Sequence, residues 1–144
     1  FHVQTNPGTA AGRLLKVASG GELSRFLLAL KVVLADRGSA PVLIFDEIDT
    51  GVGGAVADAI GRRLARLAGK VQVLAVTHAP QVAARAQRHL LIEKQAVKEG
   101  AFMRTHVKPL DVAARQEEVA RMLAGATVTD EARAAASKLL SEVG

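Results

Sequence analysis

Residues 42–54 read Val-Leu-Ile-Phe-Asp-Glu-Ile-Asp-Thr-Gly-Val-Gly-Gly. An uninterrupted run of bulky apolar residues leads into two adjacent carboxylates, Asp46 and Glu47, and a glycine-rich loop follows. A continuous apolar run of this length after Pro41 predicts an interior parallel strand over 42–45. The two carboxylates therefore come at the carboxyl end of a buried strand, which is the edge where ligands bind in open parallel α/β sheets.

Helices and strands are predicted to alternate on both sides of this stretch. Apolar residues at helical spacing predict a helix over 21–37, buried nearly all round, and a second helix over 54–69. Another continuous apolar run predicts a strand over 71–77, and a short helix follows Pro80. This alternation is typical of an α/β domain with a largely parallel sheet flanked by helices.

The C-terminal part predicts two strands around a turn, followed by two helices. The strands are expected over 90–94 and 102–107, with the turn at 98–100 between them. The last helix carries Asp130 and Glu131 in its first turn, where the helix dipole favours acids. No linker or internal repeat interrupts the sequence, so one compact unit is expected.

The composition excludes several kinds of site. The 144 residues contain no cysteine, which excludes disulfides, thiol catalysis and cysteine-ligated metal centres and fits a reducing, cytoplasmic compartment. No apolar run is long enough to span a membrane, so no membrane partner is expected. The net charge is +5, but the absence of tryptophan and tyrosine argues against a base-stacking platform for single strands. The chain begins at Phe1 in a strand-like pattern, which is expected of a fragment.

Asp46 and Glu47 are candidate residues for phosphoryl-transfer chemistry. Because side chains alternate along a strand, the two carboxylates can hold different roles. One can bind a hydrated Mg²⁺, which takes only one or two protein carboxylates, and the other can orient an attacking water. The alternative is a strand that simply ends in two solvent-facing acids.

The stretch from Ser19 to Glu22 leads directly into the first long helix. One interpretation is a capping box, in which Ser19 caps the helix and Glu22 returns a hydrogen bond to the cap. The other is an anion site, because adjacent glycines expose backbone N–H groups at the positive end of a helix. A cap alone does not require Gly20 and Gly21, since each glycine lowers helix propensity by about 1 kcal/mol. The pattern therefore favours a phosphate site.

A histidine follows the second apolar strand. If the two strands are parallel neighbours, His78 lies on the same sheet edge as Asp46 and Glu47, where an imidazole can reach a terminal phosphate. The alternative is a loop or capping histidine. Two basic clusters either contact nucleic-acid phosphates or are solvated helix faces, namely Arg62, Arg63 and Arg66, and Arg85, Arg88 and His89.

Three stretches of the sequence occur in an order shared with one superfamily of ATPases. They are Val-Ala-Ser-Gly-Gly-Glu-Leu-Ser-Arg over 17–25, Ile-Phe-Asp-Glu-Ile-Asp-Thr-Gly-Val-Gly-Gly over 44–54, and Val-Thr-His-Ala-Pro-Gln-Val-Ala-Ala over 76–84. Together they resemble the C-terminal half of an ABC-type ATPase head, and above all the RecN family of SMC-like DNA repair ATPases. The resemblance extends weakly through 118–123, so residues 1–144 are expected to form the C-terminal lobe of such a head.

The resemblance implies a role for each motif. The Walker B residue that binds Mg²⁺ would be Asp46, the catalytic glutamate Glu47 and the switch histidine His78. Six positions after the catalytic glutamate, where a D-loop aspartate is usual, this chain has Gly53, and the nearby carboxylate of the D-loop region is Asp49. The signature motif, which contacts the γ-phosphate of ATP bound on the opposite head of a dimer, would consist of Ser19, Gly20, Gly21 and Glu22.

One motif of this superfamily is missing from the sequence. No Gly-x-x-x-x-Gly-Lys-Ser/Thr phosphate loop (Walker A) occurs in the 144 residues, and there are no sustained heptads. In the resembling proteins that loop lies in an N-terminal half, beyond a long coiled coil. The implied partners are therefore the N-terminal lobe of the same protein, a second head in a homodimer, and DNA through the full-length protein. The implied cofactors are ATP and Mg²⁺, and the fragment alone is expected to bind ATP weakly and not to hydrolyse it.

The function implied by the resemblance is ATP binding and hydrolysis at a head–head interface, driving DNA double-strand-break repair in the nucleoid-associated cytoplasm. Two other functions stay open. The chain could be a non-catalytic dimerisation or interaction module whose carboxylates are structural. It could also be a DNA-binding domain that acts through its arginine clusters, with an affinity that falls steeply with salt.

Overall fold

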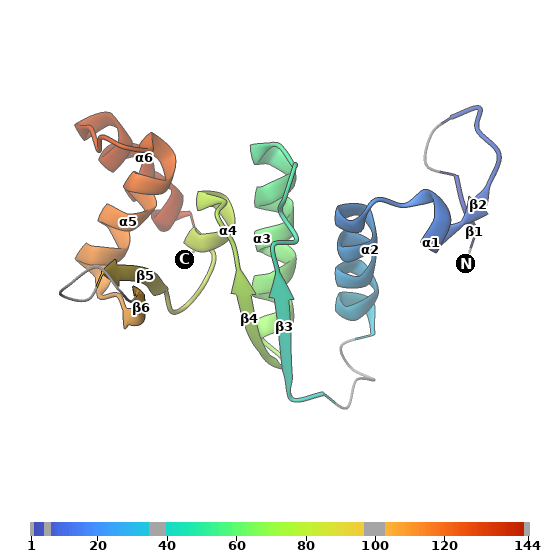
Figure 1. Ribbon diagram of the computed structural model, residues 1–144, viewed down its shortest axis with the longest axis horizontal. Coiled ribbons are helices and arrows are strands. Elements are labelled where there is room, and N and C mark those ends of the chain that lie inside the picture. Colours follow the sequence, from blue (N-terminus) through green and yellow to red (C-terminus); the bar gives the residue numbers. More distant parts are fainter. Residues whose placement is uncertain (1, 5–6, 35–39, 97–102, 143–144) are drawn as a thin grey trace. The chain divides into compact units, whose positions relative to one another are not determined.

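A computed structural model of the chain describes residues 2–4, 7–34, 40–96 and 103–142 (Figure 1). These residues form two compact units, Phe1–Val82 and Ala83–Gly144. The sequence predicted one compact unit, and the structure differs because the buried apolar residues gather in two separate clusters, one in each unit.

The first unit contains most of the predicted alternation of helices and strands. Its β-strands and helices are, in chain order, β1 (His2–Val3), β2 (Gly12–Arg13), α1 (Leu14–Val17), α2 (Gly20–Val33), β3 (Val42–Asp46), α3 (Gly54–Ala68), β4 (Gln72–Val76) and the start of α4 (Pro80–Ala84). The predicted strands at 42–45 and 71–77 and the predicted helix at 54–69 are confirmed to within one or two residues.

β3 and β4 are parallel neighbours joined by α3. In their register Val42 lies opposite Gln72, and Asp46 lies opposite Val76. Both strands therefore end at the same level, and the loops that follow them leave from one sheet edge. The other described strand pairs, β1–β2 and β5–β6, are antiparallel, so the predicted largely parallel sheet is confirmed only for β3 and β4.

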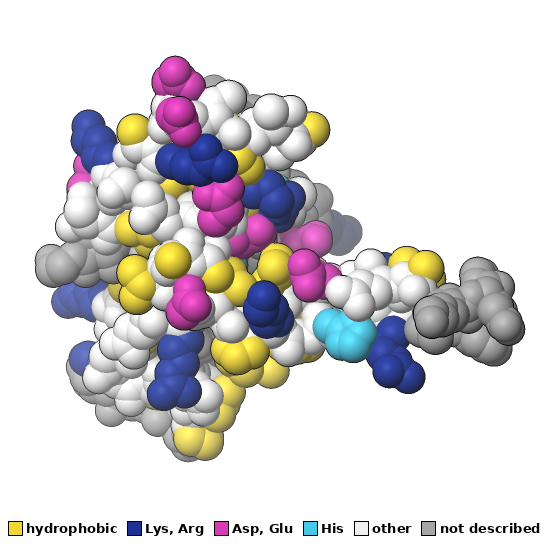
Figure 2. Space-filling model, turned by 90° about the vertical axis from the view of Figure 1, so that its left-hand side faces the viewer, with side chains coloured by type: hydrophobic (Ala, Val, Ile, Leu, Met, Phe, Trp, Pro, Cys, Tyr) yellow, Lys and Arg dark blue, Asp and Glu magenta, His cyan; other side chains and the backbone are white. Residues whose placement is uncertain are grey.

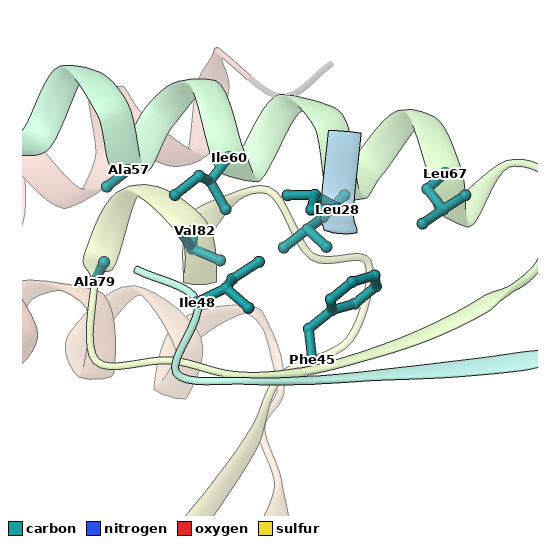
Figure 3. Packing of buried hydrophobic residues seen from close by; sticks show 9 residues of the cluster. Leu28, Phe45, Ile48, Ala57, Ile60, Leu67, Ala79 and Val82 are labelled. Atoms are coloured by element: carbon teal, nitrogen blue, oxygen red, sulfur yellow. The ribbon is translucent and has the colours of Figure 1, made fainter. Parts of the chain in front are cut away.

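The core of the first unit lies between the β3–β4 pair and α3 (Figure 3). Residues of α3 spaced three and four apart point into it, which gives the helix one apolar face. From the strand side, Phe45 and the following Ile48 pack against that face. The buried members of the cluster are Leu28, Phe45, Ile48, Ala57, Ile60, Leu64, Leu67, Ala79 and Val82.

The predictions of all-round burial are wrong for α2 and for the two parallel strands. Leu28 of α2 is 1% exposed, but its neighbour Leu27 is 46% exposed, because α2 packs against α3 with one face only. In β3 the residues alternate, so Phe45 faces α3 while Ile44, on the opposite face, is 69% exposed. The predicted helix over 21–37 is also too long, because α2 ends at Val33 and Leu34 is its C-cap; residues 35–37 lie outside the described residues.

The second unit consists of an antiparallel hairpin and two helices, together with the end of α4. β5 (Leu90–Ala96) pairs with β6 (Met103–Pro109), and α5 (Val112–Ala124) packs against α6 (Asp130–Ser141) through Val119, Ala120 and Ala136. The predicted first turn of α6 with Asp130 and Glu131 is confirmed. The predicted turn at 98–100 and Phe102 lie outside the described residues.

Arg115 joins α5 to the end of α4. Its guanidinium on α5 donates hydrogen bonds to the carbonyl oxygens of Ala84, at 2.8 Å, and Ala86, at 2.5 Å. These carbonyls belong to the last residue of α4 and to a residue just beyond it, where backbone oxygens lack helical partners. Among the described helices, none combines the length and the apolar character of a membrane-spanning segment.

Candidate active site

The paired carboxylates lie at the shared carboxyl edge of β3 and β4. Asp46 is the last residue of β3, and the N–H of Glu47 donates a hydrogen bond of 3.0 Å to the carbonyl oxygen of Val76. This bond extends the strand pairing by one residue. Both side chains are exposed, so they are accessible to a ligand at this edge.

Glu47 has an unusual backbone conformation. Its φ is +47°, and among the described residues it is the one non-glycine residue with a positive φ. This left-handed conformation costs an L-residue about 1–2 kcal/mol. The hydrogen bonds of its N–H to Val76 and of its carbonyl oxygen to the N–H of Thr50 hold it in place. Such strain concentrates at functional sites, which favours a functional role over a simple solvent-facing acid.

His78 leaves the same edge from β4. The sequence placed His78 at this edge on the condition that the two strands are parallel neighbours. This condition is confirmed, because β3 and β4 are parallel and Asp46 lies opposite Val76. The side chain of His78 is exposed. The structure therefore brings Asp46, Glu47 and His78 to one edge, as the sequence analysis expected.

Asp49 is the residue whose place the sequence analysis did not foresee. Its side chain is 2% exposed. The carboxylate oxygen Oδ2 accepts hydrogen bonds from the hydroxyl of Thr77 and, at 3.1 Å, from the N–H of Ala79. These are the residues immediately before and after His78. Nothing local in the sequence indicates this contact, because the partners are 28 and 30 residues away.

The start of α2 confirms the capping-box interpretation. The hydroxyl of Ser19 accepts a hydrogen bond of 3.3 Å from the N–H of Glu22, and the Glu22 carboxylate accepts one of 2.7 Å from the N–H of Ser19. The second bond is the main reason that the pKa of Glu22 lies below its ordinary value. A cap and a phosphate site are compatible, so the role of these residues in binding phosphate stays a prediction.

Gly21 brings the start of α2 close to the loop that follows β3. A Cβ placed on Gly21 would lie 3.6 Å from the carbonyl oxygen of Thr50 and 3.0 Å from a guanidinium nitrogen of Arg25. At 3.6 Å such a Cβ would be in ordinary van der Waals contact with Thr50, so the start of α2 packs directly against this loop. The predicted signature residues and the turn after Glu47 are neighbours in the first unit.

The predicted D-loop position is occupied by a glycine with an ordinary backbone. Gly53 is exposed and lies just before α3, with a φ of −77° and no side-chain cap. A Cβ on the next residue, Gly54, would lie 3.2 Å from the side-chain nitrogen of Gln81, so the start of α3 runs close to α4. The nearby carboxylate of Asp49 is engaged inside the unit rather than exposed.

The donor set at this edge fits Mg²⁺ bound together with a nucleotide. Among the described residues no group of three or more His, Cys, Asp or Glu side chains could hold a metal ion by itself. Asp46 offers one exposed carboxylate. Mg²⁺ is commonly bound by one or two carboxylates, with water and substrate phosphates completing its octahedron. Asp46 therefore fits as the protein ligand of such an ion.

The arginine clusters are partly engaged in contacts of their own. Arg62 forms an ion pair of 2.9 Å with Asp58, and Arg63 donates to the carbonyl oxygen of Ala59 at 3.2 Å. In the second unit Arg85 donates to the carbonyl oxygen of Glu142 at 3.2 Å. On the face shown in Figure 2, Lys and Arg side chains are interspersed with Asp and Glu side chains. These contacts favour the solvated-face interpretation over a continuous nucleic-acid surface.

The fold resembles solved ATPase heads. One similar structure comes from a study of ATP-driven dimerization and DNA-stimulated activation of SMC ATPases, with a TM-score of 0.57 and 18% identity, covering 83% of this chain and 70% of that one. Another is an SMC head domain with a coiled coil and joint derived from Pyrococcus yayanosii, with a TM-score of 0.53 and 22% identity. This match covers 78% of this chain and 20% of that one. The described fold is therefore similar to part of these solved SMC structures.

Sequence relatives define the family more narrowly. The chain is 51% identical over 140 residues to DNA repair protein RecN of Rickettsia conorii, covering 97% of this chain and 25% of that protein. It is 52% identical over 135 residues to DNA repair protein RecN of Streptomyces coelicolor, covering 94% and 23%. No family model matches the sequence. The chain belongs to the RecN family, and it spans about a quarter of the length of the curated relatives it matches.

Proposed function

We propose that this chain is the C-terminal lobe of an ATPase head, and that the full protein hydrolyses ATP between two heads in the repair of DNA double-strand breaks. The observation that supports this most directly is the shared carboxyl edge of β3 and β4, where Asp46, Glu47 and His78 all lie. The names of the RecN relatives support the repair role.

Each residue at the edge has a chemical role in this proposal. Asp46 would hold the magnesium ion that accompanies ATP, and that ion would screen the negative charge on the phosphates. Glu47 accepts a proton from the attacking water and orients it, which is the work of a general base. His78 donates a hydrogen bond to the terminal phosphate and stabilises the negative charge there.

The signature residues act on the nucleotide of the second head. Ser19 to Glu22 begin α2, where backbone N–H groups and the helix dipole favour a phosphate. Because this sequence contains no phosphate loop, the β- and γ-phosphates must be held by another part of the full protein. The nucleotide is then enclosed between the phosphate loop of one head and the signature helix of its partner.

An apolar surface is available for the missing lobe of the same head. The face of the β3–β4 pair that α3 does not cover exposes Val42, Ile44, Leu74 and Val76. Contiguous apolar surface of this kind marks a site of protein contact. We therefore place the N-terminal lobe, with its phosphate loop, against this face.

The test is the Glu47→Gln variant of the full protein, with Glu93→Gln on β5 as a matched control. Loss of a general base is expected to slow hydrolysis by about 100-fold or more. The amide keeps the size of the side chain, so ATP-dependent association of heads is expected to remain. Hydrolysis by phosphate release and association by analytical ultracentrifugation measure the two effects. If Glu47→Gln hydrolyses ATP at the parental rate, Glu47 is not the general base.

A second variant separates this function from a non-catalytic dimerisation module. Ser19→Arg places a long side chain at the start of α2 and is expected to abolish ATP-dependent association. A dimerisation module predicts instead that heads associate equally well without ATP. Ultracentrifugation of the full protein with and without ATP decides between the two.

A further inference from the structure

Asp49 is a buried acid that the proposed chemistry does not use. It lies two residues after Glu47, in the turn that follows β3, and is 2% exposed. Within the described part of the chain no cation pairs with it, and its Oδ1 atom has no hydrogen-bond partner. Burial of an ionised carboxylate is costly unless hydrogen bonds compensate for the lost water. The bonds that Asp49 does make therefore determine its role.

Those bonds go to one short segment. Oδ2 accepts from the hydroxyl of Thr77 and from the N–H of Ala79, and the same N–H lies 3.0 Å from the hydroxyl oxygen of Thr77. Hydrogen bonds to a charged acceptor are about twice as strong as neutral ones. One carboxylate oxygen thus holds the side chain of the residue before His78 and the backbone N–H of the residue after it.

The same turn also carries the candidate catalytic base. The N–H of Thr50 donates to the carbonyl oxygen of Glu47 at 3.2 Å, and the N–H of Val52 donates to that of Asp49 at 3.4 Å. The turn that positions Glu47 is therefore joined through the Asp49 side chain to the segment that carries His78. No hydrogen bond of the His78 side chain itself occurs within the described ranges.

We propose that Asp49 is a positioning residue that holds His78 at a fixed place relative to Glu47, by anchoring Thr77 and Ala79. This inference rests on the ATPase function proposed above. It gives Asp49 a role inside its own head, in place of a D-loop contact to a second head. A displacement of about 1 Å in a catalytic group can lower a rate by about 100-fold, so loss of the anchor should affect turnover.

The experiment compares four single-substitution variants of the full protein. Asp49→Asn removes the charge, Thr77→Val removes the hydroxyl, and Thr77→Ser restores a hydroxyl at that position. Asp58→Asn is the matched control, because Asp58 lies on α3 and pairs with Arg62. Asp49→Asn and Thr77→Val are expected to lower kcat about 10- to 100-fold, with KM for ATP changed less than about 3-fold. Thr77→Ser and Asp58→Asn are expected to retain parental kcat.

Two further measurements separate positioning from a general loss of structure. Hydrogen–deuterium exchange of the peptide over 77–82 should rise in Asp49→Asn and Thr77→Val and not in Asp58→Asn. In a double-mutant cycle, Asp49→Asn should slow the His78→Ala protein by less than about 2-fold, because both changes remove the same contribution. If Asp49→Asn fails to fold, Thr77→Val tests the same anchor.

The outcomes distinguish this inference from the proposed function. If Glu47→Gln and His78→Ala both hydrolyse ATP at the parental rate, the proposed function fails and this inference fails with it. If those two variants are impaired while Asp49→Asn and Thr77→Val are not, only the positioning role is overturned. The positioning role is also overturned if the losses of kcat in the Asp49→Asn/His78→Ala double variant are fully additive, because Asp49 would then act independently of His78.

Discussion

The N–H of Glu47 donates a hydrogen bond to the carbonyl oxygen of Val76, 3.0 Å away. This bond continues the parallel pairing of β3 and β4 one residue beyond Asp46. It holds Glu47 in a left-handed conformation at the point where both strands end. As a result, Glu47, the candidate base, lies at this edge beside the segment that carries His78. The placement of the site therefore depends on the register of β3 with β4.

The charge of Glu22 is predicted to oppose phosphate binding at the start of α2. Its carboxylate bonds to the N–H of Ser19 and lies at the helix terminus that the signature motif would present to ATP. Glu22→Gln keeps a capping-box side chain but removes the negative charge. We expect ATP-dependent association of heads to tighten about 2- to 5-fold, since a charge near a helix terminus contributes about 0.3–1 kcal/mol.

The measurement for Glu22 is head association by ultracentrifugation in the Glu47→Gln background, across a range of ATP concentrations. Glu131→Gln, which also changes an acid in the first turn of a helix, is the control. Weaker association in Glu22→Gln would show that the carboxylate assists, rather than opposes, the encounter.

Ile44 is predicted to contribute to stability only when the rest of the head is present. Its side chain is exposed on the face of β3 that α3 does not cover. Ile44→Asp should therefore change the free energy of unfolding of the 144-residue chain by less than about 0.5 kcal/mol. In the full protein, where we place the N-terminal lobe on this face, the same change should lower Tm by several degrees.

Thermal unfolding of both proteins measures this difference. Val112→Asp serves as the control, because Val112 is an exposed valine on α5 in the second unit. Equal shifts of Tm for Ile44→Asp in the short chain and the full protein would argue against a lobe docked on this face.

Leu28 is predicted to be the main anchor of α2. It is buried against α3 in the core of the first unit, whereas the adjacent Leu27 is exposed. Leu28→Ala should lower the free energy of unfolding by about 2–5 kcal/mol, since it leaves a cavity in a packed core. Leu27→Ala should cost much less. Urea unfolding of the 144-residue chain measures both, and similar losses would contradict the packing described here.

His89 is predicted to make the second unit less stable in mild acid. Burial lowers the pKa of His89 below its ordinary 6.5, an effect that nearby Arg115 strengthens and Glu118 opposes. The unfolded chain therefore binds the proton more readily than the folded unit, and stability falls as the pH drops below about 6.5. At pH values above 6.5 this contribution to stability is fully present.

Chemical unfolding between pH 8 and pH 5, followed by a probe in α5 or α6, measures this dependence. His89→Gln removes the titrating group, so its stability should vary less over the same range. Exposed His106, on β6, provides the control substitution His106→Gln. A wild-type unit whose stability is constant down to pH 5 would exclude the effect.

The sequence was informative wherever the physical signal is local. Apolar residues spaced three and four apart predicted α3 to within one residue, because one face of that helix meets the core. The edge shared by Asp46, Glu47 and His78 could also be predicted, since two apolar strands joined by a helix run parallel. Burial was overestimated, because an apolar run does not show whether both faces of a strand are covered.

By itself, the sequence indicated the capping box of α2 as one of two interpretations, because Ser19 and Glu22 are three residues apart and can bond within one helical turn. Only the tertiary structure decided the partners of Asp49 and the left-handed backbone of Glu47. Both depend on how β3 and β4 align across an intervening helix. The register of β3 with β4 is determined by many packing contacts in the core, so it cannot be predicted from any one short stretch of sequence.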